Sequence, residues 1–137
     1  MEQLKTIVNN DYKYSAMTGR IIGCAIEVHN ILGPGFQERI YQNALEIEMS
    51  KQGTSFVREY ENTILYKEEI VGRRRTDFLV ESNISVEIKA VSALDDADLN
   101  QAINYLEVYR LEVGLLINFG AKRLEFKRLI NSRFQRT

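Results

Sequence analysis

The segment that decides the fold is RTDFLVESNISVEIK, which covers residues 75–89. Apolar residues alternate with others on both sides of Glu81-Ser82-Asn83, and this pattern predicts two strands joined by a tight turn. If Ser82 is the tip of the turn, Phe78 lies opposite Val86. A slip by one residue would turn the apolar side chains of one strand outward, so the pattern favours this register.

Because side chains alternate across a strand, the predicted hairpin has an apolar face and a polar face. The apolar face comprises Thr76, Phe78, Val80, Ile84, Val86 and Ile88. The polar face comprises Arg75, Asp77, Leu79, Ser85, Glu87 and Lys89. The hairpin alone leaves two interpretations open, an ordinary solvated polar face or a functional site.

The polar face places two carboxylates together. Asp77 lies directly opposite Glu87 in this register, which puts their Cβ atoms about 4.5–5.5 Å apart. Two carboxylates this close repel each other unless a cation neutralises them. Oxygen ligands suit Mg²⁺ or Mn²⁺, so the pair predicts a divalent-metal site. Lys89 follows Glu87 by two residues and therefore points to the same face.

The rest of the chain predicts an α/β domain. Apolar residues at helical spacing predict helices at about 14–32, 36–51 and 95–110. Extended runs predict strands at about 57–66, 70–80, 84–90, 113–119 and 123–130. The predicted inner faces are Ile40, Ala44 and Ile47 on the second helix, and Leu99, Ile103 and Leu106 on the third. The order α-α-β-β-β-α-β-β predicts one mixed sheet with helices packed against it.

Length and composition fit one domain. The 137 residues are 45% hydrophobic, which suffices for a core. We expect a flexible N-terminus at 1–13, a single domain at 14–131 and a basic tail at 132–137. The single cysteine, Cys24, cannot form an internal disulfide, and no signal peptide or stretch of ~20 apolar residues is present. The expected location is cytoplasmic, with no membrane association.

The net charge and the local distribution of charge point to different interpretations. A net charge of −1 does not suggest a nucleic-acid-binding protein. However, Arg73, Arg74 and Arg75 are consecutive, and the chain from Lys122 onward is rich in lysine and arginine. Such clusters can hold phosphates, but charge alone favours a solvated surface.

Three motifs together resemble the PD-(D/E)XK nuclease superfamily. The first is Asp77-x9-Glu87-x-Lys89 on adjacent predicted strands. The second, Gly35-Phe36-Gln37-Glu38-Arg39-Ile40-Tyr41, resembles the GxxExxY signature of one branch of that superfamily. The third, Gln101-Ala102-Ile103-Asn104-Tyr105, resembles the QxxxY element of RecB-like nucleases. The resemblance covers most of residues 16–130 and implies a restriction-endonuclease-like core.

Two residues depart from the pattern of the superfamily. Thr76 stands where the motif name has proline, at a position that varies widely among relatives. Asp98 occupies the neighbourhood in which relatives carry a His or Glu before the helical Gln. Asp98 either replaces that group or caps the start of the helix.

The resemblance implies a role for each motif residue. Asp77, Glu87, the backbone carbonyl of Ile88, and Glu38 would bind Mg²⁺ or Mn²⁺. Lys89 would orient or help to deprotonate the attacking water. Gln101 and Tyr105 lie one helical turn apart, off the apolar stripe, and would position substrate or brace the ligands. Arg75, opposite Lys89 in the predicted register, would contact the scissile phosphate or its neighbour, and Arg73 and Arg74 would hold the nucleic-acid backbone.

The sequence therefore predicts a metal-dependent nuclease that hydrolyses phosphodiester bonds of DNA or RNA. The alternative is a catalytically inactive domain that uses the nuclease fold to bind nucleic acid or a protein partner. A nuclease of this size is expected to act with a protein partner or as a homodimer, and an apolar surface patch would be the sign of one.

Overall fold

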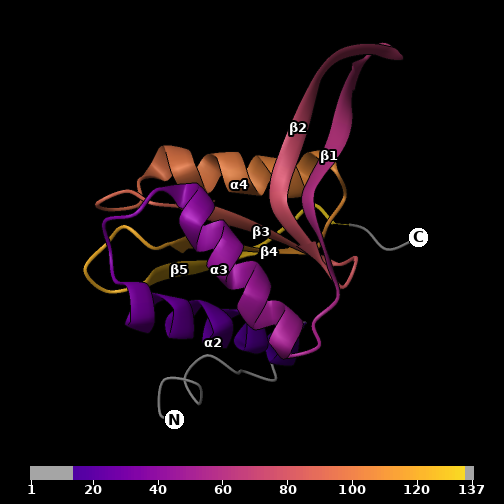
Figure 1. The fold of residues 1–137 in the computed structure, drawn as a ribbon. Helices are drawn as coiled ribbons and strands as arrows, with labels where there is room; N and C mark the ends of the chain where they lie inside the picture. The colour runs from indigo at the N-terminus through magenta and orange to yellow at the C-terminus, as the bar shows by residue number, and fades with distance from the viewer. Residues whose placement is uncertain (1–13, 135–137) are drawn as a thin grey trace.

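The computed structural model describes residues 14–134. The elements are α2 (Ser15–Leu32), α3 (Glu38–Lys51), β1 (Phe56–Tyr66), β2 (Glu69–Val80), β3 (Ile84–Lys89), α4 (Asp96–Val108), β4 (Val113–Asn118) and β5 (Glu125–Ile130). Their order confirms the predicted α-α-β-β-β-α-β-β arrangement (Figure 1). The predicted flexible N-terminus lies outside the described residues.

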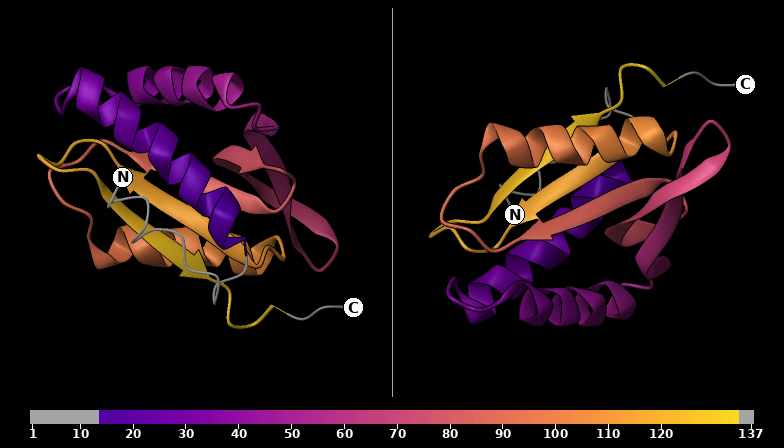
Figure 2. Two further views of the ribbon diagram at one scale, coloured as in Figure 1. Left: turned by 90° about the horizontal axis from the view of Figure 1, so that it is seen from below. Right: turned by 90° about the horizontal axis from the view of Figure 1, so that it is seen from above.

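The five strands form one mixed sheet in the order β1-β2-β3-β4-β5. Neighbouring strands are antiparallel except for β3 and β4, which are parallel. Parallel neighbours need a long crossover connection, and α4 supplies it. The helices cover both faces of the sheet, with α2 and α3 on one side and α4 on the other (Figure 2).

A hydrophobic core fills each side of the sheet. The larger core lies between the sheet and the α2–α3 pair, and its members include Ile21, Ala25, Tyr41, Leu45, Met49, Phe78, Val86 and Ile117. The smaller core lies under α4 and consists of Ala102, Leu106, Leu116 and Leu129. Because apolar residues of β4 contact both cores, this strand is buried on both faces, as its almost continuous apolar sequence predicts.

The predicted inner face of α3 is wrong for Ile40 and Ile47 but correct for Ala44, which packs against the larger core. Ile40 and Ile47 are 40% and 55% exposed, while Tyr41, Leu45 and Met49 are fully buried. Both sets have helical spacing, so spacing alone does not choose between them. The choice follows from Tyr41, whose ring stacks on Phe119 at 4.8 Å between centroids. The third helix fits its prediction better, because Leu106 is buried and Leu99 and Ile103 pack against the smaller core.

The hairpin of β1 and β2 is longer than the rest of the sheet. These strands have 11 and 12 residues, whereas β3 has 6. Their far ends therefore project from the body as a two-stranded arm (Figure 1). Among the described helices, none has the length and apolar character that crossing a lipid bilayer requires.

Candidate active site

The site lies where β2 separates from β3. The predicted register is present for three pairs, Phe78–Val86, Leu79–Ser85 and Val80–Ile84. The pairing ends there, so the predicted pairing of Asp77 with Glu87 is wrong. Beyond it, the backbone amide of Ile88 donates a hydrogen bond of 2.7 Å to Oδ2 of Asp77. A side-chain carboxylate thus satisfies an amide of β3 that β2 no longer reaches.

The neighbouring strand is also distorted at this level. Arg58 pairs with Phe78 and Tyr60 pairs with Thr76, but Glu59 between them forms no pair. Glu59 has a φ of 54°, a left-handed conformation that is uncommon for a residue with a side chain. The pairing of β1 with β2 is therefore interrupted at Glu59, beside Asp77, although the register is the same on either side of it.

The contacts of Thr76 and Arg75 differ from the predicted faces of β2. Thr76, expected on the apolar face, has its hydroxyl 2.7 Å from the hydroxyl of Ser85, which was expected on the polar face. Arg75, expected opposite Lys89, instead pairs with Glu59 of β1 at 3.9 Å, and its charge opposes the burial that raises the pKa of Asp77. The divergence of β2 from β3 is the physical reason, because a register extrapolated past Phe78 no longer describes the strand.

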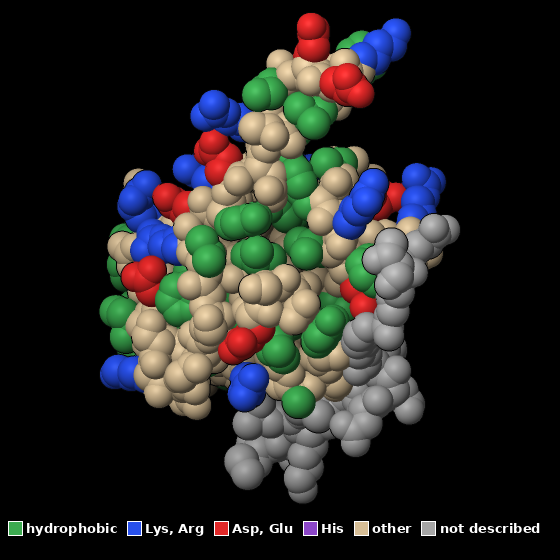
Figure 3. Space-filling model, turned by 90° about the vertical axis from the view of Figure 1, so that its right-hand side faces the viewer, with side chains coloured by type: hydrophobic (Ala, Val, Ile, Leu, Met, Phe, Trp, Pro, Cys, Tyr) green, Lys and Arg blue, Asp and Glu red, His purple; other side chains and the backbone are tan. Residues whose placement is uncertain are grey.

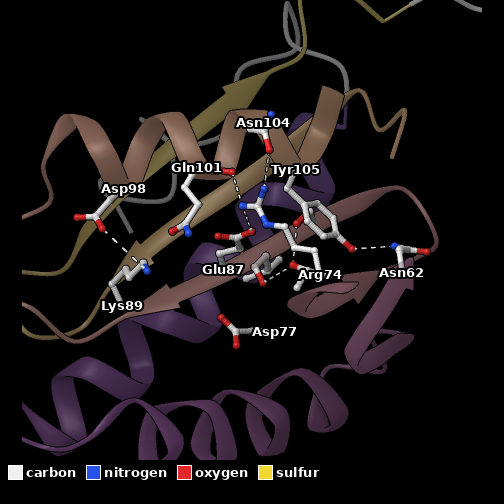
Figure 4. A network of polar contacts seen from close by, with 12 residues as sticks. Asn62, Arg74, Asp77, Glu87, Lys89, Asp98, Gln101, Asn104 and Tyr105 are labelled. Carbon is white, nitrogen blue, oxygen red and sulfur yellow. Dashed lines mark hydrogen bonds and ion pairs between the residues drawn. The ribbon is translucent and has the colours of Figure 1, made fainter. Parts of the chain in front are cut away.

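Arg74 is the arginine that reaches the site. Its guanidinium lies 3.9 Å from Oε1 of Glu87 and donates a hydrogen bond of 2.8 Å to Oδ1 of Asn104. It also donates to the backbone carbonyl of Gln101 and lies 5.4 Å from the ring centroid of Tyr105. Arg74 therefore connects the base of the arm to α4 (Figure 4). Arg73, by contrast, is exposed and pairs with Glu61.

Glu87 is a buried carboxylate with an unfilled acceptor. The residue is 9% exposed, and its Oε1 atom forms no hydrogen bond with any residue in the described range. Burial raises the pKa of Glu87, Arg74 lowers it, and the charge of Asp77 raises it further. A buried, unsatisfied carboxylate oxygen is costly, so this arrangement suits a group that is completed by a cation.

Two more carboxylates share this electrostatic environment. Burial raises the pKa of Asp77, while the hydrogen bond from Ile88 and the charge of Lys89 oppose that shift. Burial likewise raises the pKa of Glu38, at the start of α3, and Lys89 again opposes it. Lys89 also lowers the pKa of Glu87, so one ammonium group acts on all three acids.

Lys89 is held toward α4 by an acidic residue at the start of that helix. Its Nζ lies 3.9 Å from Oδ1 of Asp98. Asp98 and Asp95 form a capping box, in which each side chain accepts a hydrogen bond from the backbone amide of the other. Asp98 therefore caps α4, which is one of the two roles that the sequence left open, and it also pairs with Lys89.

The two residues of the QxxxY element have different surroundings. Gln101 is exposed, and its backbone carbonyl is the group that contacts Arg74. Tyr105 is fully buried, and its hydroxyl accepts a hydrogen bond of 3.1 Å from Asn62. Burial raises the pKa of Tyr105 to about 12, so its hydroxyl is neutral at physiological pH. This tyrosine braces the arm against α4.

The donor atoms are suited to a hard cation, although they are not gathered into a cage. Carboxylates of Asp77 and Glu87 and the carbonyl of Ile88 are oxygen donors of the kind that Mg²⁺ and Mn²⁺ prefer. In Figure 4, Asp77 lies on the opposite side of the β3 ribbon from Glu87. Within residues 14–134, no group of three or more His, Cys, Asp and Glu side chains is close enough to hold a metal ion.

Sequence reasoning missed the residue that fixes the chain just after Lys89. Asn118 is fully buried at the end of β4, and its side chain bonds both the amide and the carbonyl of Val91. The same amide group donates to Glu125 at 2.8 Å. The signal was present, because a lone Asn at the end of an apolar strand needs polar partners when it is buried.

Comparison with known proteins identifies the class. The fold is a restriction-endonuclease-like α/β domain, with a mixed five-stranded sheet between helices. The chain belongs to the PD-(D/E)XK nuclease superfamily, whose family model matches residues 15–129.

One similar solved structure is described as "Crystal structure of SSO0001", and it matches with a TM-score of 0.53 and 20% sequence identity. The match covers 86% of this chain and 59% of that chain, so this chain spans about three-fifths of its length. At this identity the similarity supports the fold alone. A search of curated proteins found no match.

Proposed function

We propose that this protein is a metal-dependent nuclease, with Asp77, Glu87 and Lys89 at its centre. One observation carries the proposal: Glu87 is 9% exposed, yet its Oε1 forms no hydrogen bond within the described chain. Membership of a nuclease superfamily and the oxygen donors nearby support the same conclusion. We also assign the chain to the GxxExxY branch, on the motif that contains Glu38.

The chain's own residues supply binding and positioning. Asp77, Glu87 and the carbonyl of Ile88 would hold Mg²⁺ or Mn²⁺, with Glu38 adding charge from α3. The metal ion, when bound, lowers the pKa of water and stabilises negative charge on the phosphate. Lys89 lies where it offsets charge among three acids, and we assign it to orient the attacking water. Substrate hydrolysis would proceed by in-line displacement at phosphorus.

The arginines divide into two groups under this proposal. Arg74 is bonded to Asn104 and to the carbonyl of Gln101, so we assign it to position Glu87 rather than to contact substrate. Arg73 and Arg75 are exposed on the arm and pair with acidic residues of β1. Such surface pairs are weak, so both arginines can exchange their partners for phosphates.

A second candidate is an inactive domain that binds a protein partner or a second copy of the chain. Hydrophobic side chains gather on the face that includes the projecting arm (Figure 3). The tip of the arm exposes Leu65, Tyr66, Ile70 and Val71 by 60–63% each. Exposed apolar surface of this kind marks interaction sites. This candidate keeps the fold and predicts no turnover.

The test is cleavage of single- and double-stranded DNA and RNA with Mg²⁺ or Mn²⁺. Wild type is compared with Asp77→Ala, Lys89→Ala and a control, Glu27→Gln, whose exposed side chain lies on α2. We expect the wild type and the control to cleave and the other two to lose activity by at least ~10²-fold. If the wild type cleaves nothing and binds no metal, the nuclease assignment fails. Equal cleavage by all variants would point to a contaminant or another site.

A further inference from the structure

A basic pocket lies at the end of the sheet that carries Lys89. Its volume is about 500 Å³, and its lining residues are Ile26, His29, Asn30, Lys122, Arg123 and Leu124. The first three belong to the last turns of α2, and the others belong to the loop between β4 and β5. In Figure 1 this loop lies at the same end of the molecule as the turn between α2 and α3.

The loop that carries the basic residues is joined to the segment that follows Lys89. The amide of Phe119 donates a hydrogen bond of 2.9 Å to the carbonyl of Lys89. One residue later, Gly120 packs so closely that an added Cβ would lie 2.5 Å from backbone atoms of Ala90 and Val91. The carbonyl of Ala121 then accepts a hydrogen bond from Nε2 of His29 at 3.0 Å. Lys122 therefore lies three residues after Phe119, which contacts the backbone of Lys89 in the proposed active site.

Among the described residues, no acidic side chain pairs with Lys122 or Arg123. Neither forms an ion pair with any residue between 14 and 134, whereas Arg58, Arg73, Arg75 and Arg133 all do. Two adjacent cations without acidic partners attract an anion, and the amide of Asn30 adds hydrogen-bonding capacity. Opposing this, the pocket lies at the C-terminal end of α2, where the helix dipole favours cations. If the two residues only complemented that helix end, they would add nothing to nucleic-acid binding.

We infer that the pocket formed by His29, Asn30, Lys122 and Arg123 binds a phosphate of the nucleic-acid strand whose scissile bond lies at Asp77, Glu87 and Lys89. This inference rests on the proposed nuclease function and extends it to the path of the strand. The strand would run from Lys89 past Gly120 and Ala121 to the pocket. The contact would be with the backbone and would carry no sequence preference.

The experiment measures binding of a fluorescein-labelled single-stranded oligonucleotide by fluorescence anisotropy, in EDTA and over a series of salt concentrations. Wild type is compared with Lys122→Ala/Arg123→Ala. A matched control, Lys51→Ala/Lys67→Ala, removes two lysines outside the pocket, one of them from the last turn of α3. A charge-preserving variant, Lys122→Arg/Arg123→Lys, completes the set. Circular dichroism confirms that each variant is folded.

For the double alanine variant we expect weaker binding and a shallower salt dependence. The slope of log K against log[salt] should fall in magnitude by about 0.7 for each phosphate that the variant no longer neutralises. The control and the charge-preserving variant should keep the wild-type slope. An unchanged slope in the double alanine variant overturns the inference, as does an equal fall in the control. A wild type that binds no oligonucleotide also overturns it.

Two further measurements separate the possible failures. Titration of inorganic phosphate, followed by NMR at the amides of Lys122 and Arg123, tests for a free-phosphate site. Shifts there, together with an unchanged oligonucleotide slope, would reject the nucleic-acid strand as the source of the phosphate. Cleavage is scored separately. If oligonucleotide binding depends on the pocket but the wild type does not cleave, only the nuclease proposal is rejected. If the wild type cleaves but the double alanine variant keeps the wild-type salt slope, only the pocket proposal is rejected.

Discussion

The carboxylate of Asp77 accepts a hydrogen bond of 2.7 Å from the backbone amide of Ile88, at the point where β2 leaves β3. This contact holds the carboxylate of Asp77 beside Ile88, which is the residue between Glu87 and Lys89. The acidic and basic groups of the motif are therefore held by backbone geometry as well as by side-chain packing.

Replacing Glu87 with Gln should stabilise the metal-free protein at neutral pH by about 1 kcal/mol, because a buried charge without a hydrogen bond to Oε1 is removed. The pKa of Glu87 is raised in the folded state, so the folded protein binds more protons than the unfolded chain just above the ordinary glutamate pKa. Wild-type stability therefore falls as pH rises through that window. The gain from Gln should be largest at pH 7 and vanish near pH 4.

Thermal unfolding of both proteins between pH 4 and pH 8 in EDTA tests this prediction. Glu27→Gln, at an exposed site, should follow the wild type throughout. A Glu87→Gln variant that is less stable than wild type at pH 7 would contradict the account of a buried carboxylate whose Oε1 lacks a hydrogen bond.

Replacing Arg74 should destabilise the protein far more than replacing Arg73. Arg74→Ala removes hydrogen bonds to Asn104 and to the carbonyl of Gln101 and leaves Glu87 without its nearest cation. We expect a loss of about 1–3 kcal/mol in the free energy of unfolding, measured in urea. Arg73→Ala removes an exposed pair with Glu61 and should cost less than about 1 kcal/mol. Equal losses would mean that Arg74 does not connect the arm to α4.

Tyr105 is expected to act as a brace rather than as an acid or base. Tyr105→Phe removes a hydroxyl that is bonded to Asn62 but keeps the buried ring. The variant should lose about 0.5–1.5 kcal/mol of stability and retain its cleavage rate. The reason is that the pKa of Tyr105, about 12, keeps its proton in place at neutral pH. A large fall in cleavage with unchanged stability would instead assign the hydroxyl to catalysis.

Gly120 should not tolerate a side chain. A Cβ at this position would lie 2.5 Å from backbone atoms of Ala90 and Val91, which cannot move aside as a flexible side chain can. We expect Gly120→Ala to lower the free energy of unfolding by about 3 kcal/mol or more and to displace the segment after Lys89. Gly72→Ala is the matched control, because nothing lies within 4 Å of its added Cβ. Similar melting temperatures for the two variants would contradict the close packing.

Most of the fold follows from local patterns in the sequence. The alternation around Ser82 predicts the register of β2 and β3, and the apolar run at residues 113–119 predicts a strand buried on both faces. The inner face of α3 does not follow in this way. Ile40 and Tyr41 both belong to helically spaced sets, and only the contact of Tyr41 with Phe119, distant in sequence, decides between them.

The site was predictable in its residues but not in its geometry. Only Phe78–Val80 of β2 pair with β3, so Asp77 lies beyond the pairing from which its position was predicted. Farther along β2, Arg74 forms the ion pair with Glu87. No local pattern in the sequence predicts where two strands separate, because the separation arises between two strands rather than within one.

The central claim is that Asp77 and Glu87 hold one divalent cation, and Mn²⁺ binding measured by isothermal titration calorimetry at pH 7.5 tests it most directly. The account predicts about one Mn²⁺ per chain for wild type and Glu27→Gln, and at least ~10-fold weaker binding for Asp77→Asn and Glu87→Gln. Affinity should also weaken as pH falls, because both carboxylates have raised pKa values and must lose their protons to bind metal. Equal Mn²⁺ affinity in all four proteins would contradict the account.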